Sequence, residues 1–313
     1  MTRLIRGIYN IAPQHTGGVI TIGNFDGVHE GHKALINKVR QQADALQAPS
    51  IVMTFEPQPL EFFKGNQGVA RLTRFREKYH ALARTGVDYV LVVQFNQTVA
   101  NWSPEVFVKS ILIDHLAAKY VIVGDDFRFG RHRQGDFSCL NQMSQQLGFG
   151  LASMPSIQLN EARISSTRIR QALADNQLEL AERLLGHPYQ MMGRVVHGDK
   201  LGRTLGFPTA NIYLHRAITP VQGIYIVRMQ GIANRPLPGV ANIGIRPTVG
   251  GTRSLLEVYL FDFDQDIYGK QVSVEFCEKI RAEERYANLE LLKAAISSDA
   301  IKARDYFEKR GEL

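Results

Sequence analysis

The chain has 313 residues, about twice the length of a common single domain, and this length predicts two domains that each bury a core. Hydrophobic residues make up 44% of it and charged residues 21%, which excludes the disordered and fibrous classes of protein. Its two cysteines, Cys139 and Cys277, are too few for a disulfide framework or a four-cysteine zinc site. Since no apolar run has membrane-spanning length or the pattern of an export signal, we expect a cytoplasmic protein with no membrane partner.

The formal net charge of +7 favours anionic partners such as phosphates or nucleic acid. A nucleic-acid-binding protein is expected to gather its positive charge on one face or tail. Here the lysines and arginines are spread along the whole chain, and the one dense basic group runs from Arg128 to Arg133. The charge by itself leaves both kinds of partner open.

The first half of the chain alternates short apolar runs with helical patterns. Strands are predicted at residues 19–22, 51–55, 89–93, 120–123 and 151–154. Helical spacing follows Leu35 to Leu46 and Phe75 to Leu82, and Ser103 is placed to cap a third helix. This order predicts a parallel sheet with helices on both of its faces.

The second half has a different rhythm. Helices are predicted up to Ala174 and over residues 178–185, and we place the domain boundary at Gly186, giving domains 1–185 and 186–313. Strands at residues 193–196, 224–229, 254–263 and 271–276, separated by Gly, Pro and Asn, predict an antiparallel β-barrel. Asn288 and Asp299 are predicted to cap two terminal helices.

A glycine-rich segment from Thr21 to His32 joins the first predicted strand to the first predicted helix. Open parallel sheets bind ligands at such junctions, and the glycines allow close approach of a ligand to the backbone. His29 and His32 are three residues apart, on one face of the helix, whose N-terminus favours anions. The pattern indicates a polyphosphate site, with a plain glycine-rich turn carrying surface or metal-binding histidines as the alternative.

Two features of the second half also suggest chemistry. Thr209 and Asn211 are two residues apart, so their oxygens point the same way if the segment is extended, as a Mg²⁺ site needs. Glu257 interrupts an apolar strand and is a candidate general base. The alternatives are a structural turn for the first pair and a salt-bridged or surface glutamate for the second.

The segment His29-Glu-Gly31-His32 resembles the first signature of nucleotidylyltransferases, and the segment from Ile164 to Arg170 resembles the second. Together with residues 54–57 and 124–130, these two segments resemble the FAD synthetase module of bacterial bifunctional riboflavin kinase/FAD synthetases. The resemblance implies a Rossmann-like domain in which the histidines hold ATP phosphates, and Arg168, Ser166 and Thr167 bind the departing pyrophosphate. Further ligand-binding positions that it implies are Gly23, Asn24, Asp26, Gly31, Asp126, Phe127 and Arg163.

One residue of this module departs from the family pattern, and two aromatic residues have two interpretations. Gln58 stands where the family usually has His, which bears on the efficiency of adenylyl transfer. Phe127 and Phe129 either stack on a flavin ring or belong to the core.

From Gly186 onward the chain resembles the riboflavin kinase module of the same family. The resemblance rests on three segments, 206–211, 240–248 and Glu257 with 261–263. It implies a barrel in which Thr209 and Asn211 bind the metal, Glu257 is the catalytic base, and Arg281 lies in a flavin-binding loop.

The sequence thus predicts an enzyme that phosphorylates riboflavin to FMN and then adenylylates FMN to FAD. ATP is the co-substrate, Mg²⁺ the cofactor, and flavins the substrates and products, with no nucleic-acid partner and homo-oligomerisation left open. One alternative is a kinase whose adenylyl module is impaired or altered. Another is a nucleic-acid-binding protein, because class I aminoacyl-tRNA synthetases carry a similar histidine signature, although their second signature is absent here.

Overall fold

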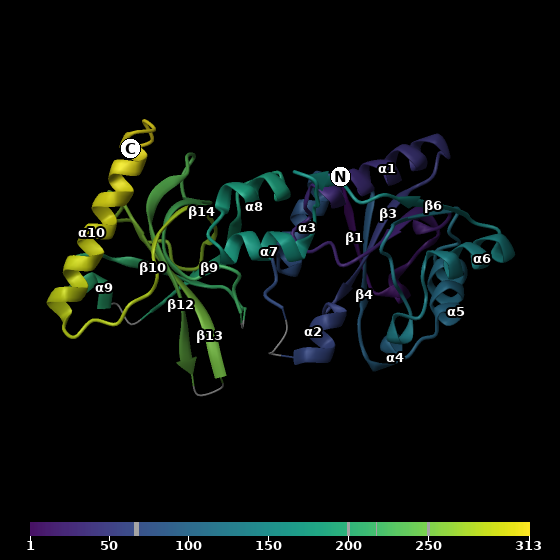
Figure 1. Ribbon diagram of the computed structural model, residues 1–313, viewed down its shortest axis with the longest axis horizontal. Helices are drawn as coiled ribbons and strands as arrows, with labels where there is room; N and C mark the ends of the chain where they lie inside the picture. The colour runs from purple at the N-terminus through teal and green to yellow at the C-terminus, as the bar shows by residue number, and fades with distance from the viewer. Residues whose placement is uncertain (66–68, 199–200, 217, 249–250) are drawn as a thin grey trace. The chain divides into compact units, whose positions relative to one another are not determined.

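The computed structural model describes residues 1–65, 69–198, 201–216, 218–248 and 251–313. The chain forms two compact units (Figure 1). The first comprises Met1–Val69 and Thr73–Ser166, and the second Ala70–Leu72 and Thr167–Leu313.

The first unit contains a parallel sheet in the order β1-β4-β3-β2-β5-β6. Its strands are β1 (Arg3–Arg6), β2 (Val19–Ile22), β3 (Ser50–Glu56), β4 (Tyr89–Gln94), β5 (Tyr120–Gly124) and β6 (Gly150–Met154). The predicted parallel sheet is confirmed, and β1 is an additional edge strand. Since β2 lies between β3 and β5, the strand order reverses beside β2, and its carboxyl end is the place where such sheets bind ligands.

Helices cover both faces of this sheet. They are α1 (Glu30–Ala45), α2 (Pro59–Lys64), α3 (Phe75–Arg84), α4 (Gln97–Ala100), α5 (Pro104–Phe107), a π-helical segment (Val108–His115) and α6 (Phe137–Leu147), and a short hairpin follows with β7 (Gln158–Leu159) and β8 (Ala162–Arg163). Alternate strand residues face two separate cores. One core includes Ile20 and residues of α5, the π-helical segment and α6, and the other includes Val19 and residues of α1 and α3.

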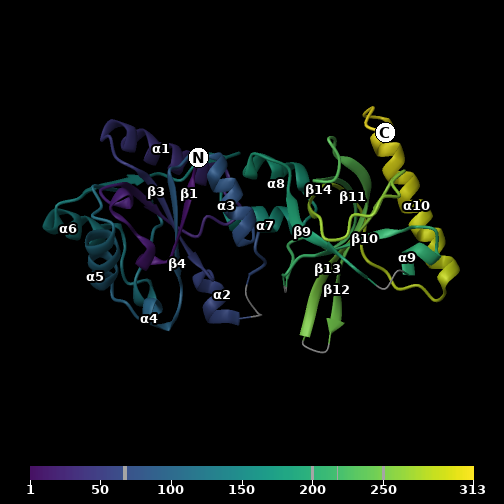
Figure 2. The ribbon, with the colours of Figure 1, turned by 180° about the vertical axis from the view of Figure 1, so that it is seen from behind.

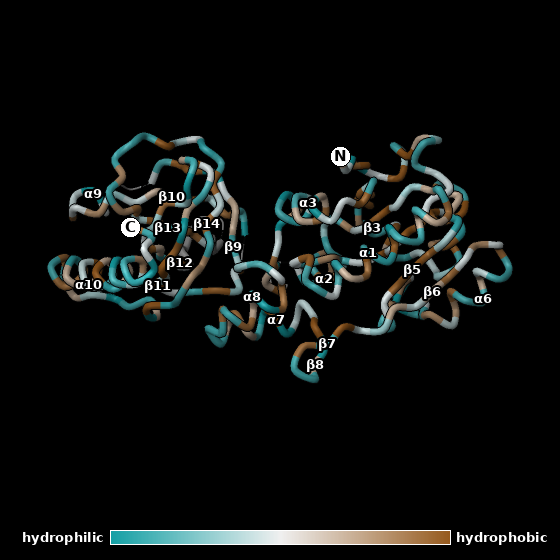
Figure 3. The backbone as a smooth tube through the Cα atoms, turned by 90° about the horizontal axis from the view of Figure 1, so that it is seen from above, coloured by the Kyte–Doolittle hydropathy of each residue, from teal (hydrophilic) through white to brown (hydrophobic). Residues whose placement is uncertain are grey.

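The second unit contains a closed antiparallel barrel in the order β10-β13-β12-β11-β14-β9 (Figure 2). Its elements are α7 (Ser166–Ala174), α8 (Leu178–Leu185), β9 (Gln190–Val196), α9 (Leu201–Thr204), β10 (Thr209–Tyr213), β11 (Gly223–Gln230), β12 (Leu237–Thr248), β13 (Gly251–Leu260), β14 (Gln271–Arg281) and α10 (Leu289–Glu308). The barrel strands have buried apolar residues in alternation, as β14 shows, and the apolar colouring in Figure 3 follows strands of both units. The predicted barrel is confirmed.

The end of the chain differs from the prediction of two helices. Residues Leu289–Glu308 form one continuous helix, α10, in which Asn288 is the N-cap and its side chain accepts a hydrogen bond from the Leu291 amide. Asp299 lies inside this helix and is buried, and its carboxylate accepts hydrogen bonds from Arg281 at 2.7 and 3.1 Å. The assignment of Asp299 as a cap was therefore wrong, because its partner is a distant arginine rather than a local amide.

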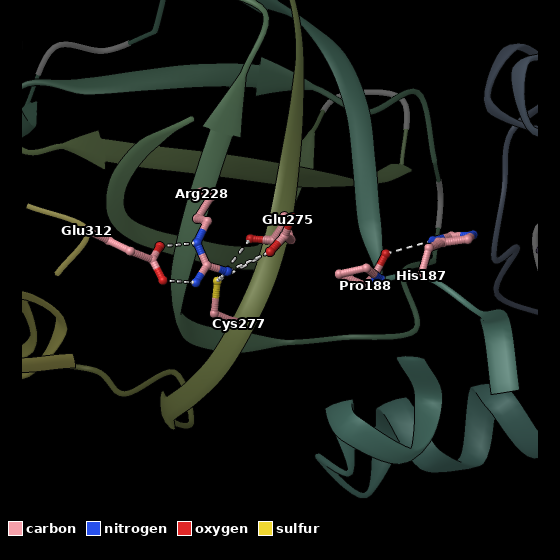
Figure 4. Close-up of polar contacts among 6 residues, drawn as sticks. All are labelled: His187, Pro188, Arg228, Glu275, Cys277 and Glu312. Carbon is pink, nitrogen blue, oxygen red and sulfur yellow. Dashed lines mark hydrogen bonds and ion pairs between the residues drawn. The ribbon is translucent and has the colours of Figure 1, made fainter. Parts of the chain in front are cut away.

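A second arginine ties the chain end to the barrel (Figure 4). Arg228 of β11 makes two hydrogen bonds to the Glu312 carboxylate at 2.6 and 2.7 Å, one to Glu275 at 2.6 Å and one to the Cys277 sulfur at 3.1 Å. Burial raises the pKa of the Cys277 thiol to about 12, so this cysteine is a protonated packing residue at neutral pH.

Helices α7 and α8 belong to the second unit and bury apolar residues such as Leu173, Leu184 and Leu185. Gly186 ends α8 with a φ of 72°, and His187 Nδ1 lies 2.8 Å from the Pro188 carbonyl. The division between the compact units thus falls at Ser166/Thr167, before the Gly186 boundary predicted from sequence. Over the described residues, no helix has the length and apolar character needed to cross a bilayer.

Candidate active sites

The loop after β2 has an uncommon backbone conformation. Phe25, Gly27 and Val28 have φ angles of 47°, 83° and 41°. Positive φ is uncommon for residues other than glycine and costs most for β-branched ones, and such strain gathers at functional sites. Phe25 and Val28 are buried in the core beneath α1, which holds the loop in this conformation.

Side chains from three other segments fasten this loop. The Asp26 carboxylate accepts hydrogen bonds from the Thr73 amide at 2.9 Å and hydroxyl at 3.1 Å, and the Gly27 amide donates to the same hydroxyl at 2.9 Å. The Thr54 hydroxyl donates to the Asn24 carbonyl at 3.3 Å, and Ser166 donates to the Asp26 carbonyl at 2.9 Å. The last bond joins the loop that precedes the first signature to the second signature, 140 residues further along the chain. Asp26, predicted to bind a ligand, turns its carboxylate toward Thr73.

The two signature histidines form a stacked pair. His29 is the N-cap of α1, and its Nδ1 accepts a hydrogen bond from the His32 amide at 3.3 Å. The rings stack with centroids 3.6 Å apart, and Phe25 meets the His32 ring edge-on. Gly31 gives this stack room, because a Cβ there would lie 3.3 Å from the His29 ring, a tight contact.

His32 is neutral at pH 7. Its pKa lies well below the ordinary value of 6.5, chiefly because the ring is buried, and positive charge at His29, Lys78 and Arg163 lowers it further. Within the described part of the chain its Nδ1 is buried with no hydrogen-bond partner. The ring can therefore offer a phosphate a hydrogen bond, whereas positive charge must come from arginines and the N-terminus of α1.

Two of the predicted ligand-binding residues, Asp126 in the segment after β5 and Arg163 of β8, lie close together. Arg163 and Asp126 form an ion pair of 2.6 Å between two exposed side chains. Phe127 and Phe129 stack at 5.3 Å, with Phe129 in the core and Phe127 partly buried against it. Of the two aromatic residues, Phe129 is a core residue and Phe127 has the more open position.

Gln58, the departure from the family pattern, lies at the carboxyl end of β3 and is 7% exposed. Its backbone amide donates to Glu61 at 3.3 Å. Among the described residues, its side-chain Nε2 is buried and has no hydrogen-bond partner. In the second signature, Thr167 and Arg168 follow Ser166 in the first turn of α7 and belong to the second unit.

In the barrel, the candidate residues lie side by side on three neighbouring strands. Asn211 of β10 pairs with Glu257 of β13, which pairs in turn with Asn242 of β12. Directly opposed residues in an antiparallel sheet share a face, so these three side chains form a polar row. Thr209 extends the row, since β10 is extended and Thr209 is two residues before Asn211.

The polar row lies on the outer face of the barrel. Leu256 and Val258, the neighbours of Glu257, are fully buried and face the interior, whereas Glu257 is half-buried. Adjacent residues of a strand point to opposite faces, so the Glu257 side chain points away from the interior that these two residues line. Asn242 Nδ2 lies 3.4 Å from Glu283 Oε1.

Two glycines make room around the candidate metal ligands. A Cβ at Gly198 would lie 2.3 Å from the Asn211 amide nitrogen, and one at Gly202 would lie 3.3 Å from Thr209 Oγ1 and 2.5 Å from a backbone oxygen. The hydroxyl, amide and carboxylate oxygens of this row fit Mg²⁺, which prefers oxygen and takes few protein ligands. In the described residues, no group of three or more His, Cys, Asp or Glu side chains offers another metal site.

Arg281, predicted to lie in a flavin-binding loop, is at the end of β14. Its guanidinium is paired with Asp299 and lies 5.7 Å from the ring centroid of Tyr286. In this conformation it joins β14 to α10.

Thr73 and Lys78 were not predicted from the sequence, and Thr54 was named only as the start of the segment 54–57. Thr73 supports the loop after β2 from a segment 46 residues away, and no local pattern marks it. Lys78 has a recognisable signal, because it shares the buried stripe of α3 with Leu82 and is itself fully buried.

Comparisons with known proteins cover both units. The family model for FAD synthetase matches residues 11–168, and the model for riboflavin kinase matches residues 185–307. The chain is 52% identical over 307 residues to the bifunctional riboflavin kinase/FMN adenylyltransferase of Escherichia coli K12, covering 97% of this chain and 98% of that protein. It belongs to the bifunctional riboflavin kinase/FMN adenylyltransferase family.

Other members of this family and one solved structure agree. The riboflavin kinase/FMN adenylyltransferase of Haemophilus influenzae is 48% identical, over 97% of this chain and 99% of that protein. A solved structure described as a macrolide-efflux protein from Streptococcus pneumoniae has a TM-score of 0.79 and 30% identity, covering 95% of this chain and 97% of that one. This likeness extends over both units of the family fold.

Proposed function

We propose that this chain makes FMN from riboflavin and ATP in its barrel, and FAD and pyrophosphate from FMN and ATP at its parallel sheet. The observation that carries the proposal is that the models of both activities match one chain, and each match contains one of the two constellations described above. Both reactions take place in the cytoplasm, as the free cysteines and the composition suggest.

In the kinase reaction, Glu257 accepts the proton of the terminal ribityl hydroxyl as that oxygen attacks the γ-phosphorus of ATP. This hydroxyl is too weakly acidic to attack unaided at neutral pH, so a positioned carboxylate is needed. Thr209 and Asn211 hold Mg²⁺, which when bound neutralises charge on the transferring phosphates. Asn242 lies beside Glu257 on the adjacent strand and borders the same site.

In the adenylyl transfer, a phosphate oxygen of FMN attacks the α-phosphorus of ATP and pyrophosphate leaves. The reaction depends on alignment and charge stabilisation and needs no covalent nucleophile. His29 and the neutral His32 bind phosphate oxygens at the N-terminus of α1, and Arg168, Ser166 and Thr167 bind the pyrophosphate. Gly23, Gly31 and Asn24 line the ATP side, and Phe127, Asp126 and Arg163 line the flavin side.

The direct test is incubation of the purified protein with riboflavin and MgATP, followed by chromatographic separation of flavins. The proposal predicts FMN first and then FAD. Accumulation of FMN without FAD, also when FMN is supplied, would mean that the adenylyl unit is impaired. Absence of both products would contradict the proposal.

We also propose that residues 186–313 are a riboflavin kinase domain able to fold alone. Helices α7 and α8 belong to the same compact unit as the barrel. A fragment that starts at Gly186 lacks both helices, and with them the buried side chains of Leu184 and Leu185. Each such leucine contributes about 1.5–3 kcal/mol. We therefore expect both fragments, from Gly186 and from Thr167, to phosphorylate riboflavin, with the shorter one melting at a lower temperature. An insoluble or unfolded Gly186 fragment would contradict independent folding.

A further inference from the structure

Lys78 has a position that is rare for a lysine. It lies in the middle of α3 with an exposed fraction of 0%, on the helix face that also buries Leu82. Burial of an ammonium group is costly unless hydrogen bonds or charges compensate, so lysines are almost never fully buried unless they are paired.

A directed chain of hydrogen bonds leads from Lys78 to the loop after β2. Lys78 Nζ donates to Thr54 Oγ1 at 3.4 Å, and Thr54 Oγ1 donates to the Asn24 carbonyl at 3.3 Å. An ammonium group can only donate, so the hydroxyl accepts from Lys78 and its own proton must point to Asn24. Because Thr54 is fully buried, this chain supports the strained loop from beneath, where no solvent competes.

The charge of Lys78 also acts on His32. Among the described residues, the charges that act on the His32 ring are those of His29 at the start of α1, Lys78 on α3 and Arg163 on β8. Each opposes protonation of the ring, in addition to the larger effect of burial. Of these groups, Lys78 is the fully buried cation, so its charge is screened least by solvent.

We propose that Lys78 is a positioning residue for adenylyl transfer: its buried ammonium group fixes the Asn24 loop through Thr54, and with it Phe25, whose ring meets that of His32. This role rests on the proposed function of the first unit and adds to it a residue outside both sequence signatures. Lys78 acts through Thr54 and His32, and no contact with the substrate is needed.

The alternative is a buried cation that serves folding alone. Replacing a buried charge with an apolar side chain of similar length is often neutral or stabilising, although it leaves any carboxylate partner uncompensated. A purely structural lysine would change the melting temperature and leave the kinetics of the folded enzyme as they were. The positioning role instead changes turnover and its pH dependence.

The test compares Lys78→Met with Lys38→Met, which removes an exposed lysine of α1. In the full chain, kcat and KM for FMN and MgATP are measured from pH 5 to 9, together with riboflavin phosphorylation and the melting temperature. We expect Lys78→Met to lower kcat of adenylyl transfer about 100-fold, the effect of a small misplacement of reacting groups. On the acid side of the pH profile, kcat of this variant should begin to fall at a higher pH than kcat of the wild type, closer to 6.5. Kinase activity should stay within about twofold, and Lys38→Met should match the wild type.

Two further variants keep the test decisive if Lys78→Met does not fold. Lys78→Arg keeps the charge, so the acid limb of its kcat profile should lie at the wild-type pH, even where kcat itself recovers only in part. Thr54→Val removes the hydroxyl and keeps the lysine, so it should lower kcat about tenfold without moving the limb. Folded variants with wild-type kcat and an unchanged pH profile would overturn the proposal. Failure of the wild type to form FAD would instead count against the proposed function.

Discussion

The two units position their functional side chains in different ways. In the first unit they lie on a loop with left-handed residues, and the loop is held by Thr54, Thr73 and Ser166 from distant segments. In the barrel, Asn211, Glu257 and Asn242 lie on strands and are aligned by antiparallel register. A site built on register is fixed by the backbone ladder of the fold. A site built on a strained loop depends on a few side chains, so single substitutions away from the substrate should disturb it more.

The largest expected effect concerns the barrel. Glu257→Gln keeps the register and the size of the side chain but removes the base, so kinase kcat should fall about 10²- to 10⁴-fold. Affinities for ATP and riboflavin should change little, and adenylylation of supplied FMN should continue. Steady-state FMN production with direct ligand titration measures both. Near wild-type turnover would remove Glu257 from the mechanism.

Thr209→Ala is the matched comparison on the same row. It removes one oxygen ligand, so MgATP binding should weaken about tenfold along with the rate. If Thr209→Ala and Glu257→Gln gave the same pattern of kcat and KM, the separate roles of the two residues would be wrong.

In the first unit, His32→Ala should lower FAD formation about 100-fold or more, because a preorganised hydrogen bond to the transferring phosphate is lost. FMN formation should remain within about twofold, since His32 lies in the first unit and the polar row of the barrel lies in the second. The measurement is separate assay of both steps in the full chain. Equal loss of both activities would contradict two independent sites.

The same contrast explains what could be predicted from sequence. Periodicity predicted strands at 19–22 and 120–123, close to β2 and β5, because a strand buried on both faces is a continuous apolar run. Gly31 and the histidines were also found, since their spacing is local. The supports of the loop were missed, because Thr73 and Lys78 act across the fold. Asp299 was misassigned as a cap for the same reason, since its partner Arg281 is 18 residues away.

A smaller effect, on stability, compares two ion pairs of α10. Asp299 is 4% exposed and Arg281 is 20% exposed, whereas Asp262, which pairs with Arg304, is 74% exposed. Breaking a fully buried pair costs about 3–5 kcal/mol, and partial exposure of Arg281 reduces this to roughly 2–3 kcal/mol for Asp299→Ala. Asp262→Ala should cost about 0–1 kcal/mol. Denaturant unfolding of the wild type and both variants, followed by far-UV circular dichroism, would show this, and equal effects would refute the ranking.

The smallest expected effect is a pH dependence of stability in the first unit. The pKa of His32 is lower in the folded chain than its ordinary value of 6.5. At pH values between the folded pKa and 6.5, the unfolded chain therefore binds more protons than the folded chain. The unfolding free energy is unaffected by this ring above pH 6.5. It falls as the pH drops from 6.5 toward the folded pKa, by up to about 1.4 kcal/mol per pH unit.

The test compares variants of His32 and of a control histidine. His32→Asn has no proton to bind, so its unfolding free energy should fall less than that of the wild type between pH 7 and pH 5.5. His80→Asn, which removes an exposed imidazole from α3, should follow the wild type. The difference between the two variants isolates His32 from the carboxylates that titrate in all three proteins. Parallel curves for wild type and His32→Asn would mean that the ring takes up its proton in the folded state, and the neutral hydrogen-bonding role of His32 would then be wrong.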